Sequence, residues 1–172
     1  TDDRIRQLTL TAAFAASAYS TNHRLKKPFN PYLGETYQYE EGNIRFFAEQ
    51  VSHHPPIGAC VLEGPNFIFW SDMSVKTKYC GNSLDVTPIG EWHVRFKNNG
   101  NHIVWSGAKT VINNIIIGSL WIDCFGQLGL KSLTHGETAE LAMKEAGSFG
   151  KDRWRCTCKV MSTDYKIQES FS

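Results

Sequence analysis

Residues Glu49–Pro56 read EQVSHHPP and close an apolar, strand-like run that begins at Ile44. The segment brings a carboxylate, an amide and a hydroxyl to the end of a strand, and two adjacent histidines follow them. The two prolines behind the histidines restrict φ, so we expect an extended backbone at this point. The pattern therefore predicts a strand whose end holds His53 and His54 with little freedom, an arrangement that suits a binding site.

Strand-like segments continue on both sides of this stretch, and turns rich in Gly and Asn separate most of them. Turns of this composition are those that β-hairpins use. The expected strands cover residues 36–40, 44–51, 57–63, 67–72, 75–80, 84–87, 92–97, 103–106, 109–114, 120–125, 128–133, 138–143 and 153–161. Short strands at such spacing, with no helix-length segment between them, predict a mostly antiparallel sandwich or barrel and not βαβ units.

Two of these segments indicate how the strand faces are used. Segment 92–97 alternates, so that Trp92, Val94 and Phe96 share one face. Segment 67–70, FIFW, is apolar on both faces, which requires apolar matter on both sides. A core helix outside a barrel with an apolar cavity inside would satisfy this requirement, and so would two ordinary packed layers.

The chain before the strands divides into two parts. Residues Leu8–Ser20, LTLTAAFAASAYS, are rich in alanine and predict a helix. Leu8, Ala12, Ala15, Ala16 and Tyr19 can share one face of that helix, and the small residues suggest close packing against another element. Residues 23–35 hold a short basic cluster and two prolines, which exclude regular helix and central strand, so we expect an ordered loop.

The composition places limits on the function. The 172 residues carry 18 Lys+Arg and 17 Asp+Glu, a formal net charge of +1, and 41% hydrophobic residues. This is enough to bury a core and argues against disorder. It also argues against a nucleic-acid binder that works through bulk charge, because there is no basic excess. The longest apolar stretch, residues 115–125, is interrupted by Gly118, Ser119 and Asp123 and is too short for a membrane span.

The cysteines point to a reducing compartment. Their odd number and the lack of a C-x-x-C pair predict neither a disulfide framework nor a zinc ribbon. Alternation in segment 153–161 places Cys156 and Cys158 on the apolar face, where they would act as small buried hydrophobes. Free thiols of this kind favour the cytosol.

Three roles compete for His53 and His54. A metal site is disfavoured, because neighbouring residues on an extended backbone point to opposite sides and no further ligand motif is present. Two histidines that simply satisfy hydrogen bonds at a strand end would be a structural solution. The third role is anion binding, since histidine donates from its ring and becomes cationic beside a phosphate. Lys26, Lys27 and Asn30 in the upstream loop would supply further donors.

These same residues carry a resemblance to a known family. Residues Glu49–Pro56 match the fingerprint of the oxysterol-binding protein family over their whole length. Upstream, KPFNPYLGET at Lys27–Thr36 resembles the family's K-P-x-N-P-x-x-G-E segment. Downstream, residues 114–126 fit its N-I…G-x-x-W-I…Y-G stretch with Phe125 in place of Tyr, and residues 148–151 fit weakly. The resemblance covers residues 8–161, and the tail at 162–172 matches no segment of the family.

The resemblance implies a fold and a function. Members of the family enclose one lipid in a large antiparallel, incompletely closed β-barrel with an N-terminal helix. They carry a sterol, or in some members phosphatidylserine, in a hydrophobic tunnel and exchange it for phosphatidylinositol 4-phosphate between membranes. The resemblance implies no catalytic residue, no cofactor and no metal. The motifs do not select which lipid is exchanged.

The family's binding residues transfer onto four positions of this sequence. By resemblance, Lys27 binds the inositol phosphate at the mouth of the tunnel, and Asn30 assists from the same loop. His53 and His54 contact the 4-phosphate. The candidates for the tunnel lining, which are equally suited to an ordinary core, are Phe46, Phe67, Phe69, Trp92 and Phe96.

The resemblance also implies that the chain is a single partial domain. Residues 1–35 form the helix and basic loop, residues 36–161 the barrel strands, and residues 162–172 an unplaced tail. Family members have a lid before the helix and a long region after the barrel. We expect a barrel without them to expose its apolar interior and to self-associate through it or through a sheet edge. The expected localisation is cytoplasmic, with transient peripheral contact to organelle membranes.

Two alternatives remain beside lipid transfer. A hydrolase would use His53 or His54 with Glu49 as acid or base, although no G-x-S-x-G motif supports it. The other alternative is a truncated fragment that has lost lipid binding and acts as an interaction module.

Overall fold

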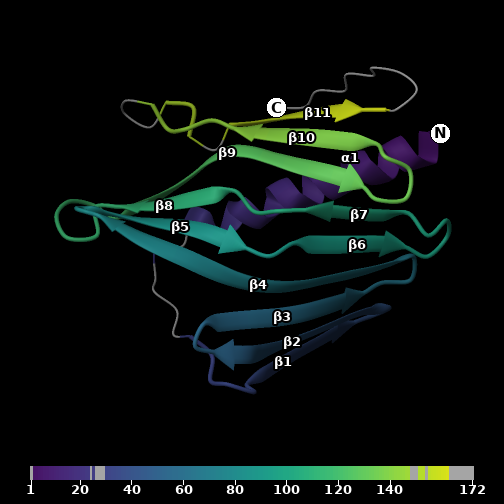
Figure 1. The fold of residues 1–172 in the computed structure, drawn as a ribbon, viewed down its shortest axis with the longest axis horizontal. Coiled ribbons are helices and arrows are strands. Elements are labelled where there is room, and N and C mark those ends of the chain that lie inside the picture. Colours follow the sequence, from purple (N-terminus) through teal and green to yellow (C-terminus); the bar gives the residue numbers. More distant parts are fainter. Residues whose placement is uncertain (1, 24, 26–29, 148–150, 154, 163–172) are drawn as a thin grey trace.

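The computed structural model describes residues 2–23, 25, 30–147, 151–153 and 155–162, which form an N-terminal helix and an antiparallel sheet (Figure 1). Helix α1 spans Asp2–Ser17, and a 3-10 helix, η1, continues it over Ala18–His23. The strands are β1 (Thr36–Glu41), β2 (Ile44–His53), β3 (Pro56–Glu63), β4 (Phe67–Cys80), β5 (Ser83–Ile89), β6 (Trp92–Phe96), β7 (His102–Trp105), β8 (Lys109–Asn113), β9 (Trp121–Ser132), β10 (Thr138–Met143) and β11 (Cys156–Met161).

The sheet is organised around two long strands, β4 and β9. Strand β6 pairs with the first half of β4, and β5 pairs with its second half. Strand β8 pairs with the first half of β9, and β7 pairs with its second half. The order is β1-β2-β3-β4-β5-β8-β9-β10-β11. Strands β6 and β7 pair with each other and form a second connection between β4 and β9. Since β1 and β11 are edges, the sheet does not close on itself. This confirms the predicted antiparallel, incompletely closed β architecture with an N-terminal helix.

Two pairs of predicted strands are single strands in the structure. Segments 67–72 and 75–80 form β4, and segments 120–125 and 128–133 form β9. In β4, Met73 and Ser74 keep their pairing with β3, so nothing ends the strand there. In β9, Gly126 takes a φ of 114°, which allows a bend, and both Gly126 and Gln127 are paired with β10.

Helix α1 covers one face of the sheet, here called the inner face. It packs against β9, β10 and β11, behind the sheet in the view of Figure 1. As predicted, Leu8, Ala12 and Ala15 are buried, and Ala16 and Tyr19 pack against the same core. The sheet contributes to this core chiefly through Phe69, Ile103, Leu128, Leu130, Leu141, Cys158 and Val160.

The helix begins at Asp2 and not at Leu8, because its polar first turns are bound to the sheet. Gln7 is buried, and its Oε1 accepts hydrogen bonds from Asn101 Nδ2 at 3.0 Å and Asn99 Nδ2 at 3.2 Å. Both asparagines belong to the β6–β7 turn, far away in the sequence. The first turns of the helix are held by hydrogen bonds to residues distant in the sequence, so a search for regularly spaced apolar residues does not detect them.

The structure decides between the two arrangements proposed for FIFW. Phe69 is buried on the inner face beneath α1. Trp70 lies on the outer face, where its ring stacks on His93 with a centroid separation of 5.0 Å. Helix α1 and the sheet are therefore two layers packed on each other at Phe69, with Trp70 on the opposite face.

The cysteines are free thiols in the structure. Cys158 is fully buried, and Cys156 is partly buried against the same core, which confirms their predicted placement on the apolar face.

Candidate functional site

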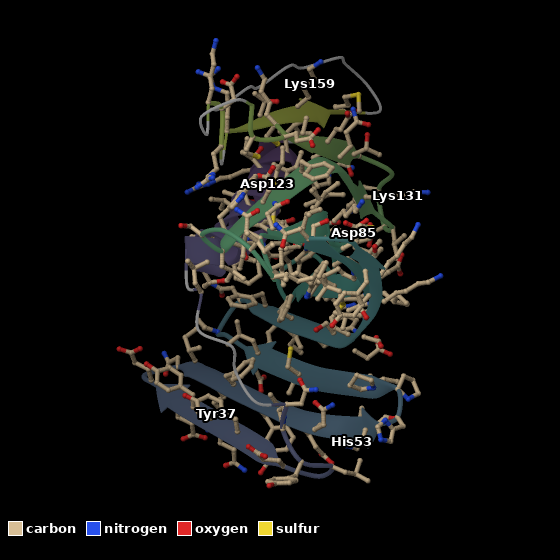
Figure 2. The ribbon with its side chains drawn as sticks, turned by 90° about the vertical axis from the view of Figure 1, so that its left-hand side faces the viewer. Tyr37, His53, Asp85, Asp123, Lys131 and Lys159 are labelled. Atoms are coloured by element: carbon tan, nitrogen blue, oxygen red, sulfur yellow. The ribbon has the colours of Figure 1, made fainter. Side chains whose placement is uncertain are left out.

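The histidine pair sits in the turn between β2 and β3. His53 ends β2 and pairs with Pro56, so the chain reverses at His54 and Pro55, whose peptide bond is cis. The predicted extended backbone is wrong here, because strand pairing continues up to the turn. The two imidazole rings are exposed and lie 4.4 Å apart between centroids, so they do not point to opposite sides. Figure 2 views this end of the sheet, with His53 labelled.

The loop before β1 is fastened beside this turn. Gly34 N–H donates to the Gln50 carbonyl at 2.8 Å, and Gln50 N–H donates to the Glu35 carbonyl at 3.1 Å. Tyr32 N–H donates to the Glu35 carboxylate at 2.8 Å. Residues 30–35 thus lie along β2 close to its histidine end. Asn30 is exposed in this loop, while Lys27 lies outside the described residues.

A cavity of about 370 Å³ opens between this loop and strands β1–β4. Gln50 and Ser71 are buried polar residues at its wall. Gln50 Nε2 donates to the Ser52 carbonyl at 2.8 Å, and Ser71 Oγ lies 3.3 Å from Cys60 Sγ. The remaining lining is Pro31, Glu35, Thr36, Tyr37, Ala48, Glu49, Gly58, Ala59, Cys60 and Met73. The walls thus combine apolar side chains with polar ones, of which Glu35, Gln50 and Ser71 have hydrogen-bond partners.

A second cavity, of about 250 Å³, lies between α1 and strands β4 and β6. Three of the predicted lining residues, Phe67, Phe69 and Phe96, form its sheet wall. Leu10 and Phe14 form its helix wall, and the Phe14 and Phe69 rings meet edge-on at 5.5 Å. The sequence patterns described above did not single out Leu10 and Phe14. The two residues are four apart and therefore share a helix face, next to the face of Leu8 and Ala12, and this spacing could have indicated a second apolar face.

The other two lining candidates lie on the same face but in different surroundings. Trp92 lines a neighbouring cavity of about 250 Å³ with Tyr19 and Trp105. Phe46 lies on β2, half-buried, with its ring 6.1 Å from that of Tyr37. Among the described residues, α1 makes at most isolated contacts with β1 and β2.

A larger cavity of about 550 Å³ adjoins the end of α1 and contains two further polar groups. Tyr19 Oη accepts a hydrogen bond from Ala108 N–H at 2.7 Å, and burial raises the pKa of Tyr19. Cys124 Sγ accepts one from Asn22 Nδ2 at 2.8 Å, and burial raises the pKa of Cys124. Both groups are therefore neutral near pH 7, and the cavity carries no charge from them.

Within the described ranges, no group of three or more His, Cys, Asp and Glu residues could hold a metal ion. In the same part of the chain, no helix is long and apolar enough to cross a membrane.

The fold and site define a β-sheet binding domain with an apolar inner face and polar groups at one end.

Comparison with known proteins identifies the family. The family model for "Oxysterol-binding protein" matches residues 1–171. Oxysterol-binding protein-related protein 6 of Mus musculus is 46% identical over 136 residues, which are 77% of this chain and 14% of that protein. The chain belongs to the oxysterol-binding protein family. This family consists of lipid-transfer proteins and not of enzymes, so the hydrolase alternative is set aside.

Solved structures agree with this assignment. The Osh1 ORD domain, solved in complex with cholesterol, superposes with a TM-score of 0.84 at 29% identity, covering 95% of this chain and 40% of that one. The Osh3 ORD of Saccharomyces cerevisiae, solved in complex with PI(4)P, gives a TM-score of 0.83 at 24% identity over 94% and 45% of the two chains, and this likeness concerns the fold alone. The present chain spans less than half of each of these proteins.

Proposed function

We propose that this chain forms the part of a lipid-transfer domain that holds a lipid on its inner face and binds the head group of phosphatidylinositol 4-phosphate at the histidine end. The observation that carries the proposal is the position of His53 and His54, side by side and exposed at the rim next to the apolar cavity of β1–β4. A phosphate needs charge-assisted donors near water, while acyl chains and sterols need a dry apolar face. The two needs are met at adjoining places.

The remaining head-group residues are proposed from the family motif. Asn30 stands in the loop that Gly34 and Gln50 fasten beside β2, and its amide would reach the head group from there. Lys27 precedes it in the same motif and would add a cation. Phe46, Phe67, Phe69, Trp92 and Phe96 would line the path of the lipid. The relative solved with cholesterol supports the sterol class of ligand for this domain. Exchange of the two lipids between membranes, by a cytoplasmic protein in peripheral contact with them, completes the proposal.

The test is extraction of lipid from vesicles by protein with His53→Ala and His54→Ala together. Extraction of phosphatidylinositol 4-phosphate should fall by at least about tenfold, because two charge-assisted donors are lost. Binding of a fluorescent sterol should stay within about twofold, since the rim does not contact its ring system. His135→Ala, in the turn at the other end of the sheet, is the matched control. Unchanged phosphoinositide extraction by the double variant would refute the head-group assignment.

The open sheet edges favour a second behaviour of the isolated chain. Every residue of β1 is exposed, and one edge of this strand has no partner among the described strands. Unpaired edges and uncovered apolar faces promote association. We expect a concentration-dependent dimer in size-exclusion chromatography with light scattering, and dye binding to the inner face. A monomer at all concentrations that binds no hydrophobic dye would contradict this.

A further inference from the structure

The loop between β8 and β9 carries two exposed aliphatic side chains. Ile116 is 74% and Ile117 76% exposed, and Tyr79 in the adjacent β4–β5 hairpin is 76% exposed. Large apolar side chains that gather at one place on a surface indicate an interaction site. The head-group and tunnel residues named above do not include these three.

The exposure of the isoleucines is built into the loop. The side-chain oxygen of Asn82, in the β4–β5 turn, accepts hydrogen bonds from the N–H groups of Ile116 at 2.9 Å and Ile117 at 3.0 Å. Its amide donates to the Ile117 carbonyl at 2.8 Å. Asn114 Nδ2 donates to the Ser119 carbonyl at 2.9 Å and closes the loop at its base. One side chain thus satisfies the loop backbone and holds both isoleucines away from the core.

This loop lies at the same end of the sheet as the histidine pair. Strands β2, β4 and β8 run in the same direction, because each is separated from the next by one antiparallel strand. They end at His53, Cys80 and Asn113, on the left in Figure 1. Tyr32 and Leu33, in the loop fastened to Gln50, are exposed at this end as well. In the described turns at the opposite end, Leu133 is the one large hydrophobic residue of comparable exposure, at 54%.

Charge at this end matches a phospholipid surface. Lys78 lies in the β4–β5 hairpin, and Lys144 and Lys151 lie in the β10–β11 loop at the same end of the sheet. All three are exposed, and within the described ranges none of them has an ion-pair partner. Glu145 lies beside them, so the excess positive charge is small. A protruding tip with aliphatic side chains, a tyrosine and a few lysines suits the boundary between acyl chains and head groups.

We propose that the 114–119 loop and the β4–β5 hairpin form a membrane-docking tip, with Ile116 and Ile117 inserted at the head-group boundary of a phospholipid bilayer. The tip holds the histidine end of the domain at the membrane surface, where a lipid enters or leaves. The biological role of this tip rests on the proposed lipid-transfer function, whereas the exposure of its side chains does not depend on that function. Insertion itself requires neither a phosphoinositide nor a sterol.

The experiment is flotation with vesicles of phosphatidylcholine and a minor share of phosphatidylserine, free of phosphoinositide and sterol. Ile116→Ser with Ile117→Ser should lower the bound fraction by at least about tenfold, since each isoleucine loses most of its apolar transfer. Val61→Ser with Leu133→Ser, two exposed apolar residues away from the tip, should bind as the unaltered protein does. Because both isoleucines are exposed, the unfolding midpoint of the tip variant should stay unchanged, which separates docking from misfolding.

Two further measurements keep this inference distinct from the head-group site. The His53→Ala, His54→Ala protein should float normally, and the isoleucine variant should still bind the soluble head group inositol 1,4-bisphosphate. Ile117→Trp should gain fluorescence quenching by brominated phosphatidylcholine. Equal flotation of the isoleucine variant and the unaltered protein would overturn the proposal. So would an unaltered protein that does not float on such vesicles at all, which would leave the tip to a protein partner.

Discussion

His93 Nδ1 lies 3.2 Å from His102 Nε2 on the outer face of the sheet, so one ring donates a hydrogen bond and the other accepts it, with the roles set by the tautomers. The ring of Trp70 covers this pair, with centroids 5.0 Å from His93 and 5.2 Å from His102. One histidine must be an acceptor for the contact to form, and protonation of both would place two cations side by side. Burial, the positive charge of Arg95 and the neighbouring His93 together lower the pKa of His102 below its usual 6.5.

This pair predicts a pH-dependent loss of stability. A histidine whose pKa is lower in the folded protein takes up its proton more readily when unfolded, so it stabilises the fold above pH 6.5 and this contribution is lost as pH falls through the folded pKa. His102→Gln, which keeps a hydrogen-bonding group without the titration, should reduce the decline of the free energy of unfolding between about pH 7.5 and about pH 5.5. Urea titrations measure it, with the exposed His53→Gln as control. An equal pH slope in the His102→Gln and unaltered proteins would count against this account.

The buried amide contacts of α1 predict the effect of Asn101→Ala. Asn101 Nδ2 donates to Gln7 Oε1 at 3.0 Å, and its Oδ1 accepts from Ser132 Oγ at 2.8 Å. Removing the Asn101 amide leaves buried partners unsatisfied, so the free energy of unfolding should fall by about 1–3 kcal/mol. Asn66→Ala, at an exposed turn of the same end, should change it by less than about 0.5 kcal/mol. Similar values for both variants in chemical unfolding would show that the network contributes little.

The strands could be predicted because their signals are local. Turns such as Gly81-Asn82 and Asn98-Asn99-Gly100 predict where the chain reverses. The alternation of apolar and polar residues in segment 92–97 predicts which strand face is directed toward the core. The continuity of β4 and β9 could not be predicted, since it depends on β3 and β10, which pair with the residues at the expected breaks. The start of α1 depends in the same way on the distant β6–β7 turn.

The candidate site was predictable in composition and not in geometry. The sequence places Phe67, Phe69 and Phe96 on apolar strand faces, but the helix wall opposite them arises from the path of α1 over the sheet. The two prolines suggested an extended segment after His53, whereas the pairing of His53 with Pro56 makes a turn that brings the histidine rings together. At the histidine turn, long-range strand pairing overrides the local preference of the backbone.

Two leucines of α1 provide a matched test of where the core lies. Leu8 is 0% exposed and Leu10 58% exposed, although they are neighbours on one helix. Leu8→Ala should lower the free energy of unfolding by about 2–5 kcal/mol, because it removes apolar contacts and leaves a cavity. Leu10→Ala should cost less than about 1 kcal/mol by thermal or urea unfolding. If Leu10→Ala were as costly as Leu8→Ala, α1 would have to lie on the sheet with a different face.

The five thiols should differ widely in their reaction with a disulfide reagent. Cys80 is exposed at the end of β4, whereas Cys124 and Cys158 are buried, and burial raises the pKa of Cys158 to about 11. Because the thiolate is the reactive form, Cys158 should react only as fast as the protein opens. Mildly alkaline buffer should therefore show one fast thiol, which Cys80→Ser removes and Cys60→Ser leaves in place. A fast phase that survives Cys80→Ser would mean that another thiol is accessible, and therefore that the inner face opens readily around Cys60 or Cys156.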